Sequence, residues 1–417
     1  MKSQQETAQF VELTLENPAY GGDTIGRLPD GRVVFVPFGI PGEKVKIRIV
    51  NDKKKYARGE LVEILEPSPQ RIEPRCQHFG TCGGCHYQHI SYENQLKIKQ
   101  RILRDQLERI GRLENPVIEP VVPSPKIFNY RNYVQFKIGQ NKRLGFYRHD
   151  KNGVLEIEEC HLPDELINQL WPLVEIDQAA GINSIGLRIG EGEDILITLE
   201  SSEPFAADFD VESLPVSVVH KSPGSTQVLA GSSLLHLQVK DKNFQVSAES
   251  FFQINLPLLE QVIDRIETRL PEKTSLVLEL YAGVGLFSSF LASRAEQLIA
   301  IESSPSAGED FVVNLDQFNN VELYEGSAEK ILPLLDIMPQ IVLVDPPRTG
   351  MKRVVLDRII NLSPELIVYL SCDPSTLARD SRILSEEGYE PEKFIPFDLF
   401  SQTFHIETLS FWQKKQD

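Results

Sequence analysis

From about residue 246 onward, the chain alternates buried-type strands with helical patterns, and this alternation constrains the fold more than any other feature. Four mainly apolar runs stand out, at residues 276–280, 298–301, 341–344 and 366–370. Apolar strands separated by helices are typical of a doubly wound, mostly parallel sheet covered on both faces. Such sheets bind their ligands at the carboxyl ends of the strands. We therefore expect an α/β fold over residues 246–417, with its chemistry at those strand ends.

A glycine turn follows the first of these strands. Gly283 and Gly285 can adopt backbone conformations that other residues avoid, and they allow a ligand to approach closely. The next strand ends at Glu302, about twenty residues on, where a carboxylate can accept hydrogen bonds from a ribose diol. The turn lacks the third glycine of a dinucleotide fingerprint, which disfavours NAD, whereas S-adenosylmethionine suits an acidic strand end equally well. The spacing predicts a nucleoside cofactor; the alternative is a merely structural glycine pair.

The two later strands also end in reactive side chains. Asp345 begins the run Asp-Pro-Pro-Arg, where it can face the cofactor or a base, although a plain strand-ending turn is the alternative. Cys372 directly follows the strand at 366–370 and precedes a helix. A thiol near a helix N-terminus tends to have a lowered pKa, so more of it is nucleophilic thiolate. Cys372 is the candidate nucleophile, and a small buried hydrophobic residue is the competing interpretation.

A thiolate has a specific use beside a methyl donor. Carbon 5 of uracil is too weak a nucleophile to take a methyl group directly, but addition of a thiolate to carbon 6 creates an enolate that is reactive at carbon 5. A base must then remove the carbon 5 proton so that the thiolate can leave. Glu407, flanked by apolar residues that can raise its pKa toward neutrality, is the candidate base, and His405 is the competing one.

Four further cysteines form a set that excludes Cys372: Cys76, Cys82, Cys85 and Cys160. Five cysteines in all, unevenly placed, are too few for a secreted disulfide scaffold. Zinc takes four thiolates, usually as two close pairs, and one triple with a distant fourth fits a four-iron, four-sulfur (4Fe-4S) cluster at least as well. Both metals remain open at this point, with His78, His86 and His89 as alternative ligands. A radical S-adenosylmethionine enzyme would need three residues between its first two cysteines, not the five found in this chain.

Charge separates the front of the chain from the rest. The net charge of −17 argues against nucleic acid, but residues 1–150 hold 24 Lys and Arg against 17 Asp and Glu, whereas the remainder holds 19 against 43. A basic front predicts a phosphate-backbone footprint. About five short strands between residues 8 and 65 predict a small OB-like barrel, a frequent binder of single-stranded nucleic acid, with Lys53 to Arg58 at one of its hairpins. A helix with a basic face is expected over 92–112.

Taken together, the motifs resemble the iron–sulfur-containing RNA uracil-C5 methyltransferases, a family acting on tRNA or 23S rRNA. The resemblance covers nearly the whole chain and is weakest over 162–245. It is carried by a TRAM-like barrel, the cysteine motif, Phe-Gln-Ile-Asn at 252–255, the glycine turn, Asp-Pro-Pro-Arg, Ser-Cys-x-Pro and His-x-Glu. It implies Cys372 as nucleophile and Glu407 as proton acceptor. It further implies a 4Fe-4S cluster on Cys76, Cys82, Cys85 and Cys160, and S-adenosylmethionine on Gln253, Tyr281, Glu302 and Asp345.

The sequence therefore predicts an S-adenosylmethionine-dependent RNA (uracil-C5)-methyltransferase in three parts. These are a TRAM-like RNA-binding barrel at 1–66, a central, mainly β domain with the cluster at 67–245, and a Rossmann-like methyltransferase domain at 246–417. We expect a cytoplasmic monomer acting on 23S rRNA or tRNA, because no run suits a membrane span and the start lacks a signal-peptide apolar core. The alternatives are an RNA cytosine-C5 methyltransferase and a non-catalytic RNA-binding protein on the same fold.

Overall fold

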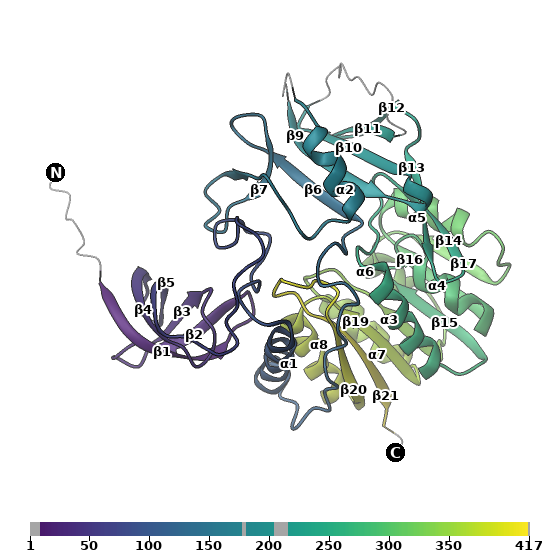
Figure 1. Ribbon diagram of the computed structural model, residues 1–417. Helices are drawn as coiled ribbons and strands as arrows, with labels where there is room; N and C mark the ends of the chain where they lie inside the picture. The colour runs from purple at the N-terminus through teal and green to yellow at the C-terminus, as the bar shows by residue number, and fades with distance from the viewer. Residues whose placement is uncertain (1–8, 177–180, 204–215, 416–417) are drawn as a thin grey trace, which may run out of the picture.

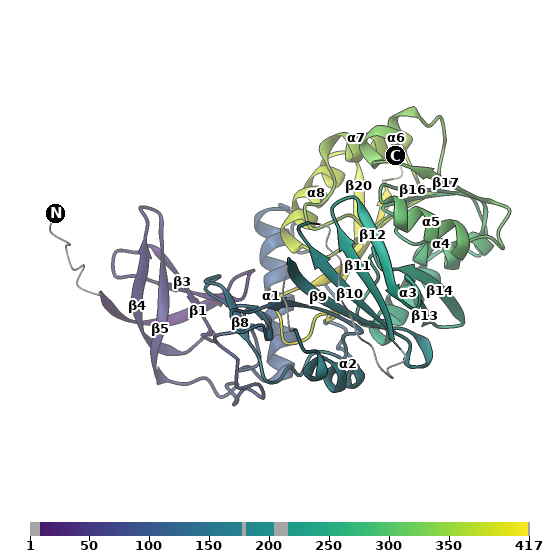
Figure 2. The ribbon, with the colours of Figure 1, turned by 90° about the horizontal axis from the view of Figure 1, so that it is seen from above.

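The computed structural model describes residues 9–176, 181–203 and 216–415. The β strands of this part of the chain form a small barrel, a seven-stranded central sheet, a two-stranded hairpin and a seven-stranded C-terminal sheet that carries most of the helices (Figure 1). The barrel stands to one side of the two sheets in both views (Figures 1 and 2). The first eight residues of the expected barrel segment lie outside the described residues.

The N-terminal barrel closes in the strand order β1-β2-β3-β5-β4. Its strands are β1 (Phe10–Pro18), β2 (Asp23–Arg27), β3 (Val33–Pro37), β4 (Lys44–Asp52) and β5 (Tyr56–Glu66). Alternate side chains point inward, as the period of a strand requires, so that Leu15, Val34 and Val45 are buried in a small core. The expected five-stranded barrel is confirmed.

The central sheet has seven strands in the order β12-β11-β10-β9-β6-β7-β8. They are β6 (Tyr133–Ile138), β7 (Leu144–Tyr147), β8 (Val154–Glu156), β9 (Ile182–Ile189), β10 (Ile195–Ser201), β11 (Val216–Ser222) and β12 (Ser225–Ala230). Helix α2 (Glu165–Leu170) packs on one face, where Ile167 joins the apolar core beneath Trp171. This sheet agrees with the mainly β pattern of its sequence.

The C-terminal sheet has the order β17-β16-β15-β18-β19-β21-β20. Its strands are β15 (Thr274–Leu280), β16 (Ala295–Glu302), β17 (Val321–Glu325), β18 (Ile341–Val344), β19 (Leu366–Ser371), β20 (Tyr389–Phe397) and β21 (Glu407–Lys414). The first five in spatial order are parallel, whereas β21 runs antiparallel to β19 and β20 antiparallel to β21. The four predicted strands are therefore confirmed within a doubly wound sheet, and the strand order reverses beside β15.

Helices cover both faces of this sheet. One face carries α3 (Leu256–Arg269), α4 (Leu286–Leu291) and α5 (Pro305–Asn314), and the other carries α1 (Tyr92–Arg109), α6 (Ala328–Ile331), α7 (Arg353–Leu362) and α8 (Pro374–Glu386). Helix α1 joins them because its apolar stripe, with Leu103 and Leu107, packs in the same core as Leu377 of α8. The hairpin of β13 (Leu234–Val239) and β14 (Lys242–Ser247) packs in the core of the opposite face. Both segments come from the range expected to form the central domain.

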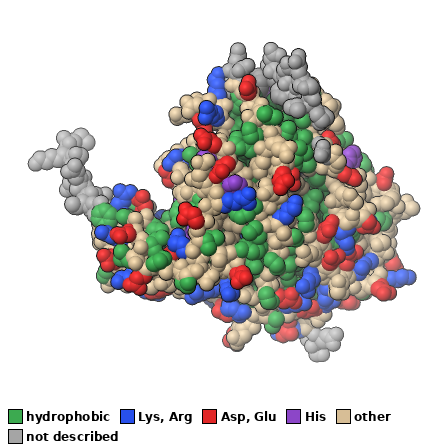
Figure 3. Space-filling model, in the orientation of Figure 1, with side chains coloured by type: hydrophobic (Ala, Val, Ile, Leu, Met, Phe, Trp, Pro, Cys, Tyr) green, Lys and Arg blue, Asp and Glu red, His purple; other side chains and the backbone are tan. Residues whose placement is uncertain are grey.

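Part of the positive charge on the barrel and on α1 is paired with acids. On the face shown in Figure 3, positive and negative side chains are interspersed over the barrel. Arg32, Arg48 and Arg58 of the barrel each form an ion pair with an acidic side chain. On α1, Lys99 is fully buried against Asp398 and does not contribute to the expected basic face. Among the described helices, none is both long and apolar enough to cross a membrane.

Candidate active site

The side chains marked in the sequence gather at one edge of the C-terminal sheet. Tyr281, Glu302, Asp345 and Cys372 lie at or just beyond the ends of β15, β16, β18 and β19, whose carboxyl ends share this edge because the strands are parallel. Glu407 reaches the same edge from the opposite direction. It begins the antiparallel strand β21, and its neighbour Thr408 pairs with Ser371 at the end of β19.

The turn after β15 is held against the end of β16. Tyr281 has a left-handed backbone (φ 65°), and its N–H donates to the carbonyl of Ile301 at 3.0 Å. The N–H of Gly283 donates to Oε2 of Glu302 at 2.8 Å. Gly285 has φ 86°, and a Cβ there would come within 2.3 Å of Leu315. The turn therefore needs its glycine at 285, and its backbone packs tightly above α4.

The carboxylate of Glu302 is fixed by backbone groups. Besides Gly283, the N–H groups of Ser303 and Ser304 donate to Oε1, at 2.7 and 2.6 Å. Ser304 is also the N-cap of α5, where its side chain accepts from the N–H of Ala307. The acidic group at the end of β16 is thus oriented before any ligand arrives.

A second carboxylate, Glu279, lies beneath this turn and was not assigned a role from the sequence. It is 1 % exposed and accepts a hydrogen bond from the hydroxyl of Ser288. Burial, together with the charges of Asp345 and Glu302, raises the pKa of Glu279 to about 8. Its sequence signal was a charged residue inside an otherwise apolar buried strand, which is rare without a partner.

Glu407 and Asp345 form an acidic pair next to Cys372. Glu407 is 2 % exposed, and its Oε1 has no hydrogen-bond partner among the described residues. Burial raises the pKa of both carboxyl groups, and the charge of Asp345 raises that of Glu407 further. A buried, unpartnered carboxyl is costly for stability, which makes it a marker of function.

Cys372 does not have the lowered pKa expected from its place before a helix. Burial, together with the charges of Glu407 and Asp345, raises the pKa of its half-buried thiol to about 12. The helix start adds a smaller contribution, because Asp373 caps α8 and its Oδ1 accepts from the N–H groups of Ser375 and Thr376, at 2.8 and 3.0 Å. The carboxylate offsets the positive helix end that was expected to stabilise the thiolate.

Arg348 supplies the opposing charge. Its exposed guanidinium lowers the pKa of both Cys372 and Glu407, and its Nη2 lies 3.5 Å from Nε2 of His405. His405, the competing candidate base, precedes β21, and its ring is half-buried beside Phe404. Burial and then Arg348 lower the pKa of His405 to about 3, so its ring is neutral at pH 7. The charge of Glu407 therefore raises the pKa of Cys372, whereas the ring of His405 faces Arg348.

Gln253 and Tyr281 were also predicted to contact the cofactor. Gln253 is buried between β14 and α3, and its carbonyl accepts from Nδ2 of Asn132 in the neighbouring central sheet at 3.3 Å. Tyr281 packs against the core on the α8 side of the sheet. Burial and the charges of Glu329 and Asp380 raise the pKa of its hydroxyl, which therefore stays protonated.

The four remaining cysteines lie near one another: Cys76, Cys82 and Cys85 belong to the segment between β5 and α1, and Cys160 follows β8 of the central sheet. Each sulfur faces a hydrogen-bond donor. Backbone N–H groups face three of them: that of His78 faces Cys76, that of Gly84 faces Cys82 at 3.4 Å, and that of Leu162 faces Cys160. The side chain of Gln88 faces Cys85. The side chains of Cys82, Cys85 and Cys160 also face the guanidinium of Arg131. Within the described ranges, no three or more Cys, His, Asp or Glu side chains close into a formed metal site. Of the alternative ligands, His78 is engaged, because its Nε2 accepts from the N–H of Glu158 at 3.0 Å.

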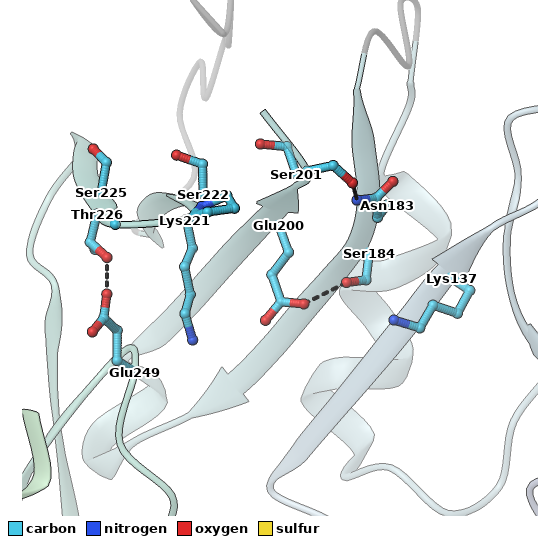
Figure 4. Close-up of a pocket in the computed structure, with 13 residues that line it drawn as sticks. Lys137, Asn183, Ser184, Glu200, Ser201, Lys221, Ser222, Ser225, Thr226 and Glu249 are labelled. Carbon is cyan, nitrogen blue, oxygen red and sulfur yellow. Dashed lines mark hydrogen bonds between the residues drawn. The ribbon is translucent and has the colours of Figure 1, made fainter. Parts of the chain in front are cut away.

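An open hollow lies elsewhere. It lies on the central sheet and has a volume of 820 Å³. Within it, the hydroxyl of Ser184 donates a hydrogen bond to Glu200, and the hydroxyl of Thr226 donates one to Glu249 (Figure 4). Lys137 and Lys221 line the same hollow. None of the residues marked in the sequence borders it, and we assign no chemistry to it.

Comparison with known proteins agrees with this geometry. Residues 4–62 match the TRAM domain, and residues 200–335 and 331–415 match the tRNA (uracil-5-)-methyltransferase family. A protein described as an uncharacterized RNA methyltransferase of Aquifex aeolicus is 35 % identical over 97 % of this chain and 99 % of its own length. Another, of Thermosynechococcus vestitus, is 32 % identical over 96 % of this chain and 97 % of its own length.

A solved structure has the same fold. The tRNA (uracil-54, C5)-methyltransferase of Pyrococcus abyssi, in complex with S-adenosyl-L-homocysteine, superposes with a TM-score of 0.74 at 24 % identity, covering 96 % of this chain and 100 % of that one. The matching family models and the full-length relatives show that this chain is an S-adenosylmethionine-dependent RNA methyltransferase and belongs to the tRNA (uracil-5-)-methyltransferase family.

Proposed function

We propose that the enzyme methylates carbon 5 of a uridine in RNA through a covalent bond between Sγ of Cys372 and carbon 6 of the base. The observation that carries this proposal is the convergence of Cys372 with a buried, unpartnered Glu407 at the cofactor edge of the sheet. A nucleophile and a base that approach one site from different strands are what covalent methylation of a pyrimidine requires.

The proposed sequence begins at sulfur. Cys372 gives its proton to water, and the thiolate adds to carbon 6, which places negative charge on carbon 5. S-adenosylmethionine, when bound, supplies the methyl group that carbon 5 takes. Glu407 then accepts the carbon 5 proton, the bond to Sγ breaks, and the electron pair returns to sulfur. Glu407 releases its proton to water and the thiolate of Cys372 takes a proton back from water, so that the net release is one proton for each methyl group transferred.

The charges around the site support these roles. A carboxylate with a raised pKa is a stronger proton acceptor, and burial gives Glu407 that property. Arg348 lowers the pKa of Cys372 and therefore favours the thiolate that must attack. We propose that Arg348 also faces the charge that develops on the pyrimidine ring, because it is exposed on the side of the site where RNA can enter.

For the cofactor, we propose that Glu302 binds the ribose and that Tyr281, Gln253 and Asp345 complete the pocket. Doubly wound sheets hold their ligands where the strand order reverses, and β15, β16 and β18 meet at that point. The orientation of Glu302 by Gly283 and the N-terminus of α5 supports its role, because a preoriented acceptor loses less entropy on binding.

For the cysteine segment, we propose that Cys76, Cys82, Cys85 and Cys160 hold a 4Fe-4S cluster. The donor set suits it, since N–H groups that face thiolate sulfurs are typical of such sites, and Arg131 offsets part of the negative charge. The cluster would fix the backbone beside the base, because the N–H groups of His86 and Tyr87 donate to the carbonyl of Gln402, at 2.9 and 3.1 Å. Gln402 lies five residues before Glu407.

The RNA partner is either 23S rRNA or tRNA, and we expect a monomer to act on it. The chemistry is the same in both RNAs, because a splayed-out uridine presents the same carbon atoms wherever it lies. The choice between them depends on the shape of the RNA loop. Methylation assays with transcripts of each RNA would test it directly.

The decisive experiment uses RNA that contains 5-fluorouridine. Fluorine on carbon 5 blocks proton removal, so the protein should remain covalently attached to the RNA when S-adenosylmethionine is present. Cys372→Ala should form no adduct. On ordinary RNA, mass spectrometry of the nucleosides should find 5-methyluridine. Absence of the adduct in the wild-type enzyme would exclude the mechanism, and 5-methylcytidine as the product would replace uridine with cytidine as the substrate.

A further inference from the structure

A turn of the barrel reaches the reactive edge of the C-terminal sheet. It lies between β1 and β2, and the ring of its Tyr20 packs edge-on against Phe404, with 5.5 Å between the ring centroids. Two residues later, Gly22 lies so close to His86 that a Cβ would meet the imidazole ring at 3.0 Å. The barrel therefore contacts the segment that leads into Glu407, as well as the cysteine segment.

Apolar packing extends this contact to the residue before the proposed base. Ile406 is completely buried, and it shares a core with Ile40 of the barrel and Ile102 of α1. Tyr20 and Phe404 pack against the same core. Side chains from the N-terminal 40 residues thus surround the segment just before β21, more than 360 residues later in the chain.

The same tyrosine also reaches the nucleophile. Its hydroxyl faces the carboxylate of Asp373, to which it can donate a hydrogen bond; Asp373 caps α8 and adjoins Cys372. Burial and Asp373 raise the pKa of Tyr20, so the hydroxyl keeps its proton and remains a donor. One barrel side chain therefore contacts both the turn that carries Cys372 and the segment that carries Glu407.

We propose that Tyr20 is a positioning residue for methyl transfer, which holds the Cys372–Asp373 turn and the Phe404–Glu407 segment in the arrangement that the reaction needs. The inference rests on the proposed function of Cys372 and Glu407. It gives the barrel a role beyond RNA binding, since the active site is complete only when the barrel is docked on the sheet.

Electrostatics gives this contact a measurable signature. The charge of Asp373 raises the pKa of Cys372 and so opposes formation of the thiolate. The hydrogen bond from Tyr20 draws part of that charge away from sulfur. Loss of the hydroxyl should therefore slow the reaction and move its acidic limb to higher pH.

The test compares Tyr20→Phe with Tyr389→Phe under single-turnover conditions at saturating RNA. Tyr389 also donates a hydrogen bond, to the carbonyl of Pro364 at 3.0 Å, but it lies at the opposite end of the sheet. We expect Tyr20→Phe to lower the methylation rate about tenfold, the loss typical of one hydrogen bond to a charged group. RNA affinity and thermal stability should stay near those of the wild type, and Tyr389→Phe should keep the wild-type rate and pH profile.

A second comparison uses Asp373→Asn, which keeps the helix cap but removes the charge. If Tyr20 acts on that charge, adding Tyr20→Phe to this variant should no longer shift the pH profile. A wild-type rate and pH profile in Tyr20→Phe would overturn the inference, and so would a loss confined to RNA affinity. Neither result affects the 5-fluorouridine adduct of the wild-type enzyme, which tests the proposed function separately.

Discussion

The five cysteines lie in two regions whose surroundings differ in charge. Cys372 faces the carboxyl groups of Glu407 and Asp345, whereas Cys82, Cys85 and Cys160 face Arg131 and hydrogen-bond donors. Burial raises the pKa of the thiol in both regions, so burial does not distinguish them. The neighbouring groups do, because carboxylates disfavour a thiolate and make it reactive when it forms, whereas N–H donors and a cation stabilise thiolates that serve as permanent ligands.

The strongest test of this comparison removes one thiol from each region. We expect Cys372→Ala to lower methylation at least about 1,000-fold, because no other thiol is placed to add to the base. If the proposed cluster is bound, the iron content and thermal stability of Cys372→Ala should equal those of the wild type. Cys160→Ala should instead lose the proposed cluster and unfold at a lower temperature. Full iron occupancy in Cys160→Ala, measured by metal analysis and visible absorption, would contradict the assignment of the four ligands.

Replacement of the base should trap the intermediate. Glu407→Gln removes the proposed proton acceptor but keeps the shape of the side chain, so turnover should fall between about 100- and 10,000-fold. A methylated covalent adduct with ordinary RNA should accumulate, visible as a shifted band on a denaturing gel. His405→Gln is the matched control and should turn over without trapping. Trapping by His405→Gln and normal turnover by Glu407→Gln would reverse the two roles.

Removal of Arg348 should leave the negative charges around Cys372 without the positive charge that opposes them. Without the guanidinium, the pKa of Cys372 rises further, so at neutral pH less thiolate is present and the rate should fall about tenfold. The rate of Arg348→Gln should recover as the pH increases, whereas Arg348→Lys should behave more like the wild type because it keeps the charge. Single-turnover rates across pH test this. A uniform loss at every pH would show that Arg348 acts through contact with RNA and not through the thiol.

The last expected effect is on stability and not on the rate. Folded Glu279 keeps its proton up to about pH 8, whereas the unfolded chain releases it near pH 4.5, so stability should fall as the pH rises through this window. The slope is at most about 1.4 kcal/mol per pH unit. Glu279→Gln should therefore gain stability relative to the wild type as the pH increases, and the exposed Glu322→Gln should not. Urea unfolding at several pH values measures the difference, and parallel curves would show that Glu279 is ionised in the folded protein.

Most of the C-terminal half could be predicted from the sequence because its signals are local. Mainly apolar runs mark β15, β16, β18 and β19, and parallel strands bring their carboxyl ends to one edge. That rule alone places Glu302, Asp345 and Cys372 together. The glycine turn is equally local, since the left-handed backbone at Gly285 leaves no room for a side chain.

The sequence was less informative where distant segments meet. The sequence predicts that helix α1 is amphipathic, but its pattern does not predict that its apolar stripe packs beside α8. The pKa expected for Cys372 was wrong for a related reason. The rule for helix N-termini considers the helix alone, whereas the structure adds the cap at Asp373 and the carboxyl groups of Glu407 and Asp345.

The sequence by itself determined which residues have the chemistry, namely one thiol at a strand end, a carboxylate near the last strand and four cysteines in a separate set. The tertiary structure decided what surrounds them. Antiparallel pairing of β21 with β19 brings Glu407 to Cys372, and docking of the barrel brings Tyr20 to Asp373. Periodicity encodes which face of an element is apolar, but burial and charge depend on what packs against that face, so the reactivity of Cys372 could be assigned only in three dimensions.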